Sequence, residues 1–447
     1  MKKQLTIILI LLSTIGLVGI FMWLEFSESA KKNNLIVYNA EQKEIEVKLV
    51  ESVSTKLVPA TVTFKDNTKS TFQLIEPFRL AVAAEGLGKV RFMAMSSDGR
   101  MFVPDLVNLN LSYEGKIYVL ENFDETDKRF RTKNVYLSGL RGPNSVAFYI
   151  DENGQEWIYI ALTANIIRYP YSAGDTKPLA DPETITTFPN KQVLGETSVV
   201  WHITRTIKFY NNRLYVSVGS GCNACEQPDG EMRAMIYSMN PNGNDKQIYA
   251  EGLRNAVGFT WADGELYATV NGADHLGPQI PDDMMYKLIK NKHYGWPYCY
   301  ESNGRIYPDT SRTWTQSFLC ERVPRSFSAF EPHAAPLGIQ YFSEDSHPLL
   351  KNTFLVALHG SFKPEIGAGY HIIKVSKNGE QEIFMDDFLV EKDERSGWFI
   401  NTAHAHTDQL TGGIERLGRP VDILQNDANS FFFTDDYNGR IYYVYAE

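Results

Sequence analysis

The chain has 447 residues, 22% charged and 43% hydrophobic, and these fractions exclude a disordered chain and are typical of a globular protein. Its 54 Asp and Glu residues outnumber its 44 Lys and Arg residues, which gives a formal net charge of −10. Because nucleic-acid binding depends on clustered basic residues, this balance argues against a nucleic-acid partner. The many Tyr, Phe and Trp residues, punctuated by 32 Gly and 20 Pro, favour short strands joined by turns.

Residues 1–30 have the pattern of an export signal. Lys2 and Lys3 precede an uncharged apolar run, residues 5–24, which is about long enough to cross a bilayer as a helix. Small residues within 27–30 offer a cleavage site, so the pattern fits either a cleaved signal peptide or a retained anchor. Since the positive-inside rule keeps the two lysines in the cytoplasm, we expect the rest of the chain in the periplasm or another extracytoplasmic space. Membrane attachment through residues 5–24 would follow if the run is retained.

Two further parts follow this segment. Residues 31–79 contain short alternating apolar segments and are predicted to be accessory strands. Residues 80–447 repeat one pattern, in which a polar turn is followed by two apolar strands separated by an Asp, Asn or Gly turn. Six copies begin near residues 90, 143, 204, 254, 336 and 419.

A hairpin of this kind cannot bury both of its faces alone, so the repetition predicts that the copies pack against one another radially. We expect an all-β fold, a six-bladed β-propeller that follows the N-terminal signal or anchor segment. The largest insertions, residues 277–332 and 379–418, are expected in loops at the faces of the propeller. A β-sandwich or a pair of β domains is the alternative, because the copies are unevenly spaced.

The four cysteines are predicted to form disulfides, because their number is even and export would place them in an oxidising compartment. We expect Cys222 to pair with Cys225, and Cys299 to pair with Cys320 across a loop rich in Tyr, Asn, Gly, Pro and Ser. A four-thiolate zinc site is the alternative. Attachment of a c-type haem is excluded because Glu226, not His, follows the Cys-x-x-Cys pair.

In a propeller, the residues just before the first strand of each blade converge on the axis at one face. In this chain these positions hold Arg91, Asn144, His202, Arg254 with Asn255, His333 and Arg419. The loops after the following strands add Asn271, Gly272, Ala273, His359 and Lys363. Four cations around one cavity would repel one another unless an anion occupied it, so the pattern predicts an anionic ligand. Solvated charges at the rim are the alternative for each residue taken alone.

His202 is the candidate general base. At the mouth of a cationic cavity, neighbouring positive charge would hold its pKa low and leave the neutral imidazole that a base requires. The alternative is a buried ring bonded by the backbone. His404 and His406 lie in an insertion and lack a third clustered ligand, which argues against a transition-metal site there.

Specific segments of the sequence carry a resemblance to a known family. They read HITRTIKF with LYVSVGSGCNACE, GLRNAVGFTWADGELYATVNGAD, YGWPYCYE, PHAAPLGIQYF, FLVALHGSF, and GRPVDIL with the terminal DDYNGRIYYV. Through these segments, in this order, the chain from about residue 90 resembles the soluble glucose and sorbosone dehydrogenase family. Members of that family are six-bladed propellers that bind pyrroloquinoline quinone (PQQ) and calcium.

The resemblance implies a catalytic role for His202 and Arg254. His202 would take the proton of the substrate hydroxyl as hydride moves to the quinone. Arg254 and Asn255 would hydrogen-bond the quinone oxygens, where negative charge builds up during the reaction. The cofactor supplies the redox chemistry, and the protein supplies orientation and electrostatics.

The resemblance also implies the remaining cofactor contacts. Arg419 and Lys363 would hold the carboxylates of PQQ, with Arg91 as a weaker candidate for the same role. Ca²⁺ would be held by backbone carbonyls around Gly272 and Ala273, since hard oxygen donors suit this ion.

We therefore expect an exported quinoprotein dehydrogenase that oxidises a sugar, or a related hydroxyl or aldehyde hydrate, and passes electrons to a separate acceptor. Residues 31–79 have no match in the family, and Asn144 stands where relatives often have a histidine, so the substrate is less certain than the cofactor. A calcium-dependent propeller hydrolase or lactonase is one alternative, although it would want a ring of Asp, Glu and Asn around its metal. A binding domain without catalytic activity is another.

Overall fold

In a computed structural model of the chain, the structure describes residues 55–108, 112–188, 201–227, 231–392, 399–400 and 413–446. The predicted export segment, much of the predicted accessory segment, and His404 with His406 lie outside the described residues. Among the described residues, no helix is both long enough and apolar enough to span a membrane.

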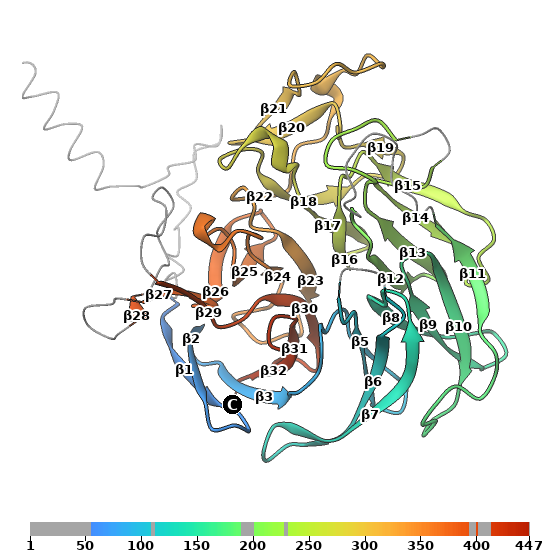
Figure 1. Cartoon of the computed structure of the whole chain (residues 1–447), viewed down its shortest axis with the longest axis vertical. Helices are drawn as coiled ribbons and strands as arrows, with labels where there is room; N and C mark the ends of the chain where they lie inside the picture. Colours follow the sequence, from blue (N-terminus) through green and yellow to red (C-terminus); the bar gives the residue numbers. More distant parts are fainter. Residues whose placement is uncertain are drawn as a thin grey trace, which may run out of the picture. The chain divides into compact units, whose positions relative to one another are not determined.

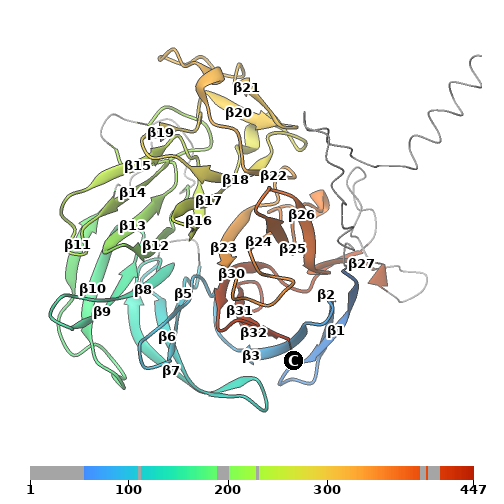
Figure 2. The same cartoon turned by 180° about the vertical axis from the view of Figure 1, so that it is seen from behind.

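The described residues form six sheets of four to six strands, which are arranged around a common centre (Figure 1, and from behind in Figure 2). The predicted all-β, six-bladed propeller is thereby confirmed. The innermost strands of the six blades are β4, β8, β12, β16, β23 and β30. Inner strands of adjacent blades contact one another around the centre. Residues just before these inner strands therefore meet at one end of the central channel.

The first three blades are formed by consecutive strands. Blade 1 consists of β4 (Ala94–Met95), β5 (Met101–Asp105), β6 (Gly115–Asp124) and β7 (Arg129–Leu140). Blade 2 consists of β8 (Ser145–Ile150), β9 (Glu156–Ala161), β10 (Asn165–Tyr171) and β11 (Glu183–Thr187). Blade 3 consists of β12 (Arg205–Tyr210), β13 (Arg213–Val218), β14 (Met235–Met239) and β15 (Gln247–Glu251). The short strand β19 (Lys292–His293) pairs in parallel with β15 as a fifth strand.

The last three blades contain the longer insertions. Blade 4 consists of β16 (Ala256–Ala262), β17 (Glu265–Val270), β18 (Asp283–Leu288) and β22 (Ser328–Phe330). Blade 5 begins with β23 (Pro336–Phe342), β24 (Thr353–Leu358), β25 (His371–Ser376) and β26 (Gln381–Asp386). Blade 6 contains β30 (Pro420–Gln425), β31 (Ser430–Asp435) and β32 (Arg440–Tyr445).

The insertions are shorter than the sequence suggested. Residues 277–332 and 379–418 were both expected to be loops, but β18 and β22 complete blade 4 and β26 extends blade 5. The sequence pattern was defined on hairpins of two strands, so it missed these outer strands of the blades. Between β18 and β22 the chain forms a projecting hairpin, β20 (Cys299–Ser302) with β21 (Arg305–Pro308), and the 3-10 turn η2 (Cys320–Arg322) (Figure 1).

Smaller elements complete the described chain. The 3-10 turns η1 (Asp274–Leu276) and η3 (Pro364–Ile366) follow β17 and β24. A small sheet of β27 (Leu389–Lys392), β28 (Phe399–Ile400) and β29 (Gly413–Arg416) precedes blade 6. In the structure the four cysteines form the two expected disulfides, Cys222–Cys225 and Cys299–Cys320. This pairing excludes the four-thiolate zinc site.

The N-terminal strands of the described chain pack against its C-terminal blades. β3 (Arg79–Ala84) pairs with β32 as the outer strand of blade 6, and this pairing closes the ring without a covalent link. β1 (Leu57–Thr63) and β2 (Lys69–Ile75) form a hairpin that pairs with β26 and widens blade 5. Closure of this kind leaves few strand edges open for pairing with other chains.

The inner strands come unusually close together at the centre. A Cβ at Gly258 would lie 2.1 Å from Leu337 O, and a Cβ at Gly338 would lie 2.6 Å from Asp422 Cα. β16, β23 and β30 each shift register near their first residues, and this places both glycines at the equivalent position of adjacent blades. Glycine is required there because any side chain would separate the blades.

Phe72 joins the N-terminal hairpin to two blades. It is fully buried, and its ring lies 4.9 Å from that of Phe388 and 5.7 Å from that of Tyr442, measured between centroids. We expect Phe72→Ala to lower the free energy of unfolding by about 3–5 kcal/mol, because it opens a cavity in a closely packed aromatic cluster. Urea unfolding followed by tryptophan fluorescence measures this change. Thr63→Ala, at an exposed position of the same hairpin, is the control, and equal effects of the two variants would contradict the packing role.

Candidate active site

A cavity of about 170 Å³ opens at one end of the central channel. Its wall comes from blades 4, 5 and 6, at the starts of β16, β23 and β30 and in the loops after β17 and β24. The structure therefore brings together predicted site residues from distant parts of the sequence. The lining residues are Arg254, Asn271, Gly272, Ala273, Asp274, Pro281, Asp283, His333, Ala335, Gly360, Ser361, Phe362 and Arg419.

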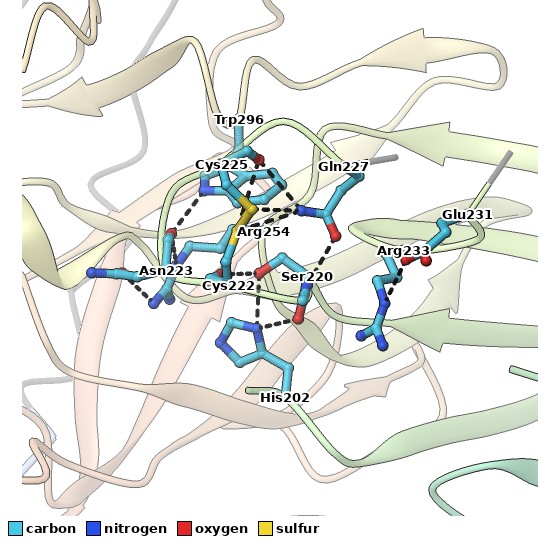
Figure 3. The surroundings of a disulfide bond; sticks show 11 residues. His202, Ser220, Cys222, Asn223, Cys225, Gln227, Glu231, Arg233, Arg254 and Trp296 are labelled. Carbon is cyan, nitrogen blue, oxygen red and sulfur yellow. Dashed lines mark hydrogen bonds and ion pairs between the residues drawn. A yellow bond between two sulfur atoms is a disulfide. The ribbon is translucent and has the colours of Figure 1, made fainter. Parts of the chain in front are cut away.

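Arg254 lines this cavity and contacts the loop that contains the disulfide Cys222–Cys225 (Figure 3). Its side chain is only 5% exposed. Nε donates to Asn223 O at 2.9 Å, and Nη2 donates to Asn223 Oδ1 and to Asp274 Oδ2, both at 2.8 Å. Nη1 donates to Gly272 O. The guanidinium is thus fixed from three sides and its charge is paired with Asp274.

Asp274 also faces His333 across the cavity wall. Asp274 Oδ1 lies 3.5 Å from His333 Nδ1, and His333 Nε2 donates to Gly277 O at 2.9 Å. The contact with Asp274 raises the pKa of His333. Partial burial alone would raise the pKa of Asp274, but His333 and Arg254 together lower it to about 2. The pair favours a charged imidazolium beside a carboxylate.

Asp283 lies beneath the cavity and is 3% exposed. Its Oδ1 accepts a hydrogen bond from Gly272 N at 2.5 Å, and its Oδ2 accepts one from Ala335 N at 2.7 Å. Burial raises its pKa to about 6, against the effect of these bonds. Asp283 thereby holds the loops after β17 and before β23 at a fixed separation.

His202 approaches the site from the start of blade 3. Its Nδ1 lies 2.9 Å from Ser220 Oγ and 3.1 Å from Ser220 O. Burial and the nearby Arg254 charge lower the pKa of His202 to about 3, so the imidazole is neutral at ordinary pH. Among the described residues, none hydrogen-bonds its Nε2, which leaves this nitrogen available as a base.

Several residues around the cavity have a left-handed backbone. The φ angles are 43° at His202, 66° at His333 and 52° at Ala335. Side-chain-bearing residues adopt this region rarely, and such residues gather at functional sites where the surrounding structure holds them in place. Both histidines of the site are therefore held by their surroundings, not by local preference.

Arg419 supplies the second guanidinium of the cavity. It donates from Nε to His359 O at 3.0 Å and from Nη2 to Gly360 O, and its guanidinium carbon lies 5.7 Å from the centre of the Tyr370 ring. Both acceptors are neutral carbonyls, and no ion pair of Arg419 is present within the described part of the chain. Arg419 thus places at the cavity wall a positive charge that is not directly ion-paired, and Asp436 acts on it only at longer range.

Arg91 lies in a buried network next to the cavity and is not one of its lining residues. Its Nη1 donates to Asp436 Oδ2 at 2.9 Å and its Nε donates to Asn144 Oδ1 at 3.0 Å. Asp436 Oδ1 is 2.8 Å from His359 Nε2. Burial alone would raise the pKa of Asp436, but His359 and Arg91 hold it far below its usual value. Burial lowers the pKa of His359 to about 4.

Two other predicted residues lie at the edges of the site. Asn255 donates to Asn271 Oδ1 at 2.8 Å, behind the wall formed by Gly272. Lys363 is exposed beside Phe362, which lines the cavity and is 85% exposed. Asn255 shapes the wall, and Lys363 stands at the rim.

Sequence reasoning missed the acidic residues of the site. Asp274 directly follows the Asn-Gly-Ala segment that was singled out, and Asp436 lies in the DDYNGR segment that was quoted without a role. Asp283 and Asn223 were not noticed. The signal for Asp274 was its position next to the predicted carbonyls, whereas the partner of Asp436 is Arg91, which is 345 residues away along the chain.

The donor set fits an anionic cofactor together with a hard cation. Arg419 offers a guanidinium without a direct carboxylate partner to a planar carboxylate, and guanidinium binds such groups well. The N–H groups of Arg254 already have acceptors in the protein, among them Gly272 O and the Asp274 carboxylate. Backbone carbonyls of the loop after β17 are oxygen donors of the kind that Ca²⁺ prefers. In the part of the chain that the structure describes, no three His, Cys, Asp or Glu side chains form a metal-binding group, so backbone carbonyls would have to contribute.

The comparison with known proteins identifies the family. The family model described as TrAA12-like matches residues 72–447. The chain belongs to the TrAA12-like family. The relationship to PQQ-dependent sugar dehydrogenases that was predicted from the sequence is thereby confirmed at the level of the family.

Solved structures that share the fold of this TrAA12-like protein include sugar dehydrogenases. The Trichoderma reesei AA12 protein, in its iodide structure, is 18% identical with a TM-score of 0.63, covering 84% of this chain and 98% of that one. The holo PQQ domain of Coprinopsis cinerea pyranose dehydrogenase is 17% identical with a TM-score of 0.62, covering 84% and 97%. PQQ-bound aldose sugar dehydrogenase from Streptomyces coelicolor is 16% identical with a TM-score of 0.56, covering 83% and 98%. At these identities the likeness shows the shared fold.

A curated relative is closer in sequence. An uncharacterized protein of Borreliella burgdorferi (strain ATCC 35210) is 31% identical over 245 residues. The alignment covers 53% of this chain and 58% of that protein, so the chain matches little more than half of the relative's length.

The Asp436 cluster gives a testable electrostatic prediction. We expect Asp436→Asn to lower the free energy of unfolding at pH 7 by about 3 kcal/mol, because it leaves Arg91 buried without its counter-charge. Pairing depresses the pKa of Asp436 in the folded state, so its stabilisation is present above the unfolded pKa of about 4 and is lost as the pH falls below it.

Urea unfolding from pH 7 to pH 3 measures both effects. The difference between the wild type and Asp436→Asn should shrink toward pH 3. Asp345→Asn, at an exposed position, is the control. A difference that is constant with pH would show that the charge of Asp436 is not what stabilises the cluster.

Proposed function

We propose that the protein is a quinoprotein dehydrogenase that oxidises a hydroxyl or aldehyde hydrate of a sugar with PQQ and Ca²⁺ and passes electrons to a separate acceptor. The observation that carries the proposal is a cavity at one propeller mouth that is lined by Arg254 and Arg419, with the neutral His202 near Arg254 at the start of blade 3. Membership of the TrAA12-like family supports it, as do the PQQ-containing structures that share the fold.

Each residue has a proposed role in this reaction. Arg419 would bind a carboxylate of PQQ, with Lys363 contributing from the rim. Arg254 would face the quinone oxygens and stabilise negative charge there, and Asn255 would support the same wall. PQQ, when bound, would supply the acceptor for the hydride of the substrate carbon.

His202 would act on the substrate. Its Nδ1 faces Ser220, so Nε2 is the nitrogen that would take the hydroxyl proton. A neutral imidazole is needed for this step, and the low pKa of about 3 keeps it neutral. The calcium ion would be held by the carbonyls of Gly272 and Ala273.

Export and membrane attachment remain part of the proposal. They rest on the apolar run at residues 5–24 and on the two disulfides, which fit an oxidising compartment.

The hydrolase alternative fits the site less well. Asp274 and Asp283 do supply the carboxylates that such an enzyme needs for its metal. Both oxygens of Asp283 already accept backbone N–H groups, however, and Asp274 is paired with Arg254 and His333. These pairings leave too few free carboxylate oxygens around one point to hold a catalytic ion.

Reconstitution tests the function directly. Apoprotein treated with a chelator and then loaded with PQQ and Ca²⁺ is expected to reduce an artificial electron acceptor dye in the presence of one or more aldoses. PQQ without Ca²⁺, and Arg419→Gln with both, are the controls and should show little activity. If the wild type neither changes the PQQ absorbance nor reduces the dye with any sugar, the proposal is wrong.

His202 can be tested in the reconstituted protein. We expect His202→Ala to lower kcat by roughly two to four orders of magnitude while leaving the affinity for PQQ nearly unchanged, as is usual for a lost general base. The matched control is His347→Gln, since His347 packs on Phe78 away from the cavity. Steady-state kinetics and a PQQ titration separate the two quantities, and an equal loss of affinity would assign His202 a structural role instead.

A further inference from the structure

The loop after β13, residues 219–227, is closed in two ways. The disulfide joins Cys222 to Cys225, only three residues apart. The side chain of Gln227 accepts from Gly221 N at 2.9 Å and donates to Cys225 O at 3.3 Å and toward Cys225 Sγ at 3.2 Å (Figure 3). A disulfide that closes so short a loop restricts the unfolded chain less than one that closes a long loop. Its contribution is therefore expected more in the local geometry than in global stability.

The first contact of this loop is with His202. Ser220 Oγ donates to Cys222 O at 2.6 Å, so its lone pairs are available to accept from His202 Nδ1 at 2.9 Å. Ser220 O also lies 3.1 Å from Nδ1, and a carbonyl can only accept. Both contacts therefore require the proton on Nδ1 and leave the lone pair on Nε2, which is the form that a base needs.

The approach of His202 to the loop is close. A Cβ at Gly219 would lie 2.5 Å from His202 Cβ and 2.6 Å from Asn255 Oδ1. Only glycine permits this approach, so the backbone of the loop packs directly against the side chain of His202.

The second contact of the loop is with Arg254. Asn223 lies between the two cysteines, and its backbone carbonyl accepts from Arg254 Nε at 2.9 Å and from Trp296 Nε1 at 3.1 Å. Its Oδ1 accepts from Arg254 Nη2 at 2.8 Å and from Asp274 N at 3.0 Å. One residue of the loop thus accepts four hydrogen bonds and ties Arg254 to both walls of the cavity.

From these contacts we propose that the Cys222–Cys225 loop is a positioning element of the active site, in which Ser220 sets the tautomer of His202 and Asn223 sets the orientation of Arg254. The disulfide holds the two positioning residues at a fixed separation, so that the base and the guanidinium keep a fixed arrangement. Neither Ser220 nor Asn223 touches the reacting atoms. The inference rests on the proposed function only for its catalytic consequence.

The tautomer of His202 can be observed without cofactor. Full-length protein labelled with ¹⁵N-histidine reports the protonated ring nitrogen through its ¹⁵N shifts, and the spectrum of His202→Gln assigns the signal. We expect a pure Nδ1–H form in the wild type. In Cys222→Ser/Cys225→Ser we expect a mixture of the two tautomers. The matched control is Cys299→Ser/Cys320→Ser, which removes the longer disulfide loop and should lower Tm more while leaving the His202 signal unchanged.

The role of Asn223 is measured through PQQ binding, followed by quenching of tryptophan fluorescence. We expect Asn223→Ala to weaken PQQ binding by about tenfold, the effect of one lost hydrogen bond to a charged group. Asn223→Asp keeps the accepting oxygen and should restore most of the affinity. Circular dichroism and Tm establish that each variant is folded.

The outcomes separate this inference from the proposed function. A His202 signal in Cys222→Ser/Cys225→Ser that is identical to the wild type overturns the role of the loop in setting the tautomer. Equal PQQ affinities of Asn223→Ala and the wild type overturn the role of Asn223. If the wild type itself does not bind PQQ, the proposed function fails, and the tautomer measurement still decides whether the loop positions His202.

Discussion

A guanidinium that is 5% exposed must have an acceptor for nearly every N–H group, and in this propeller the acceptors of Arg254 come from separate loops. Asn223 follows β13, whereas Gly272 and Asp274 follow β17. The side chain therefore fixes the distance between blades 3 and 4 at the cavity mouth. The hydrogen bonds of this one residue therefore set the part of the cavity wall that blade 4 contributes and connect it to the disulfide loop of blade 3.

Two of the three arginines around the cavity form ion pairs. Arg254 is paired with Asp274, and Arg91 is paired with Asp436. Arg419 donates only to carbonyls, so the positive charge that faces the cavity comes mainly from this residue. An anion would be attracted to this side of the cavity. Burial first, and then the charge of Arg254, lower the pKa of His202 and keep its imidazole neutral.

The sequence contained enough information for the fold and for half of the site. Repeated hairpins had to pack radially, and the residues before each inner strand had to meet, so Arg254, His333 and Arg419 were predicted to converge. What could not be predicted is which cations are paired. Arg91 and Arg419 both lie near the start of an inner strand, but Arg91 of blade 1 meets Asp436 of blade 6, and that contact exists only after the ring has formed. Charge alone could not distinguish a cofactor-facing arginine from a structural one.

The roles of several glycine and aspartate residues also could not be predicted from the sequence. Gly219, Gly258 and Gly338 look like ordinary turn residues in the sequence, yet each marks a point where two blades or a histidine come into direct contact. Asp283 looks like a loop acid in the segment PDD, yet it is buried and binds two backbone N–H groups. The role of such a residue depends on how close two segments lie in the folded protein, and the hydrophobic periodicity of the sequence carries no information about that distance.

The pairing of β3 with β32 also determines the order in which this molecule can be assembled. Blade 6 takes one strand from near the start of the described chain and three from near residues 420–445, so its sheet cannot be completed until β32 has been synthesised. Until then β3 has no partner, and the channel that β30 helps to line remains open on one side. Contacts between such distant segments form slowly, and unpaired strands meanwhile expose edges that favour aggregation. The candidate site, with Arg419 at the beginning of blade 6, therefore forms only after β3 and the strands of blade 6 have come together.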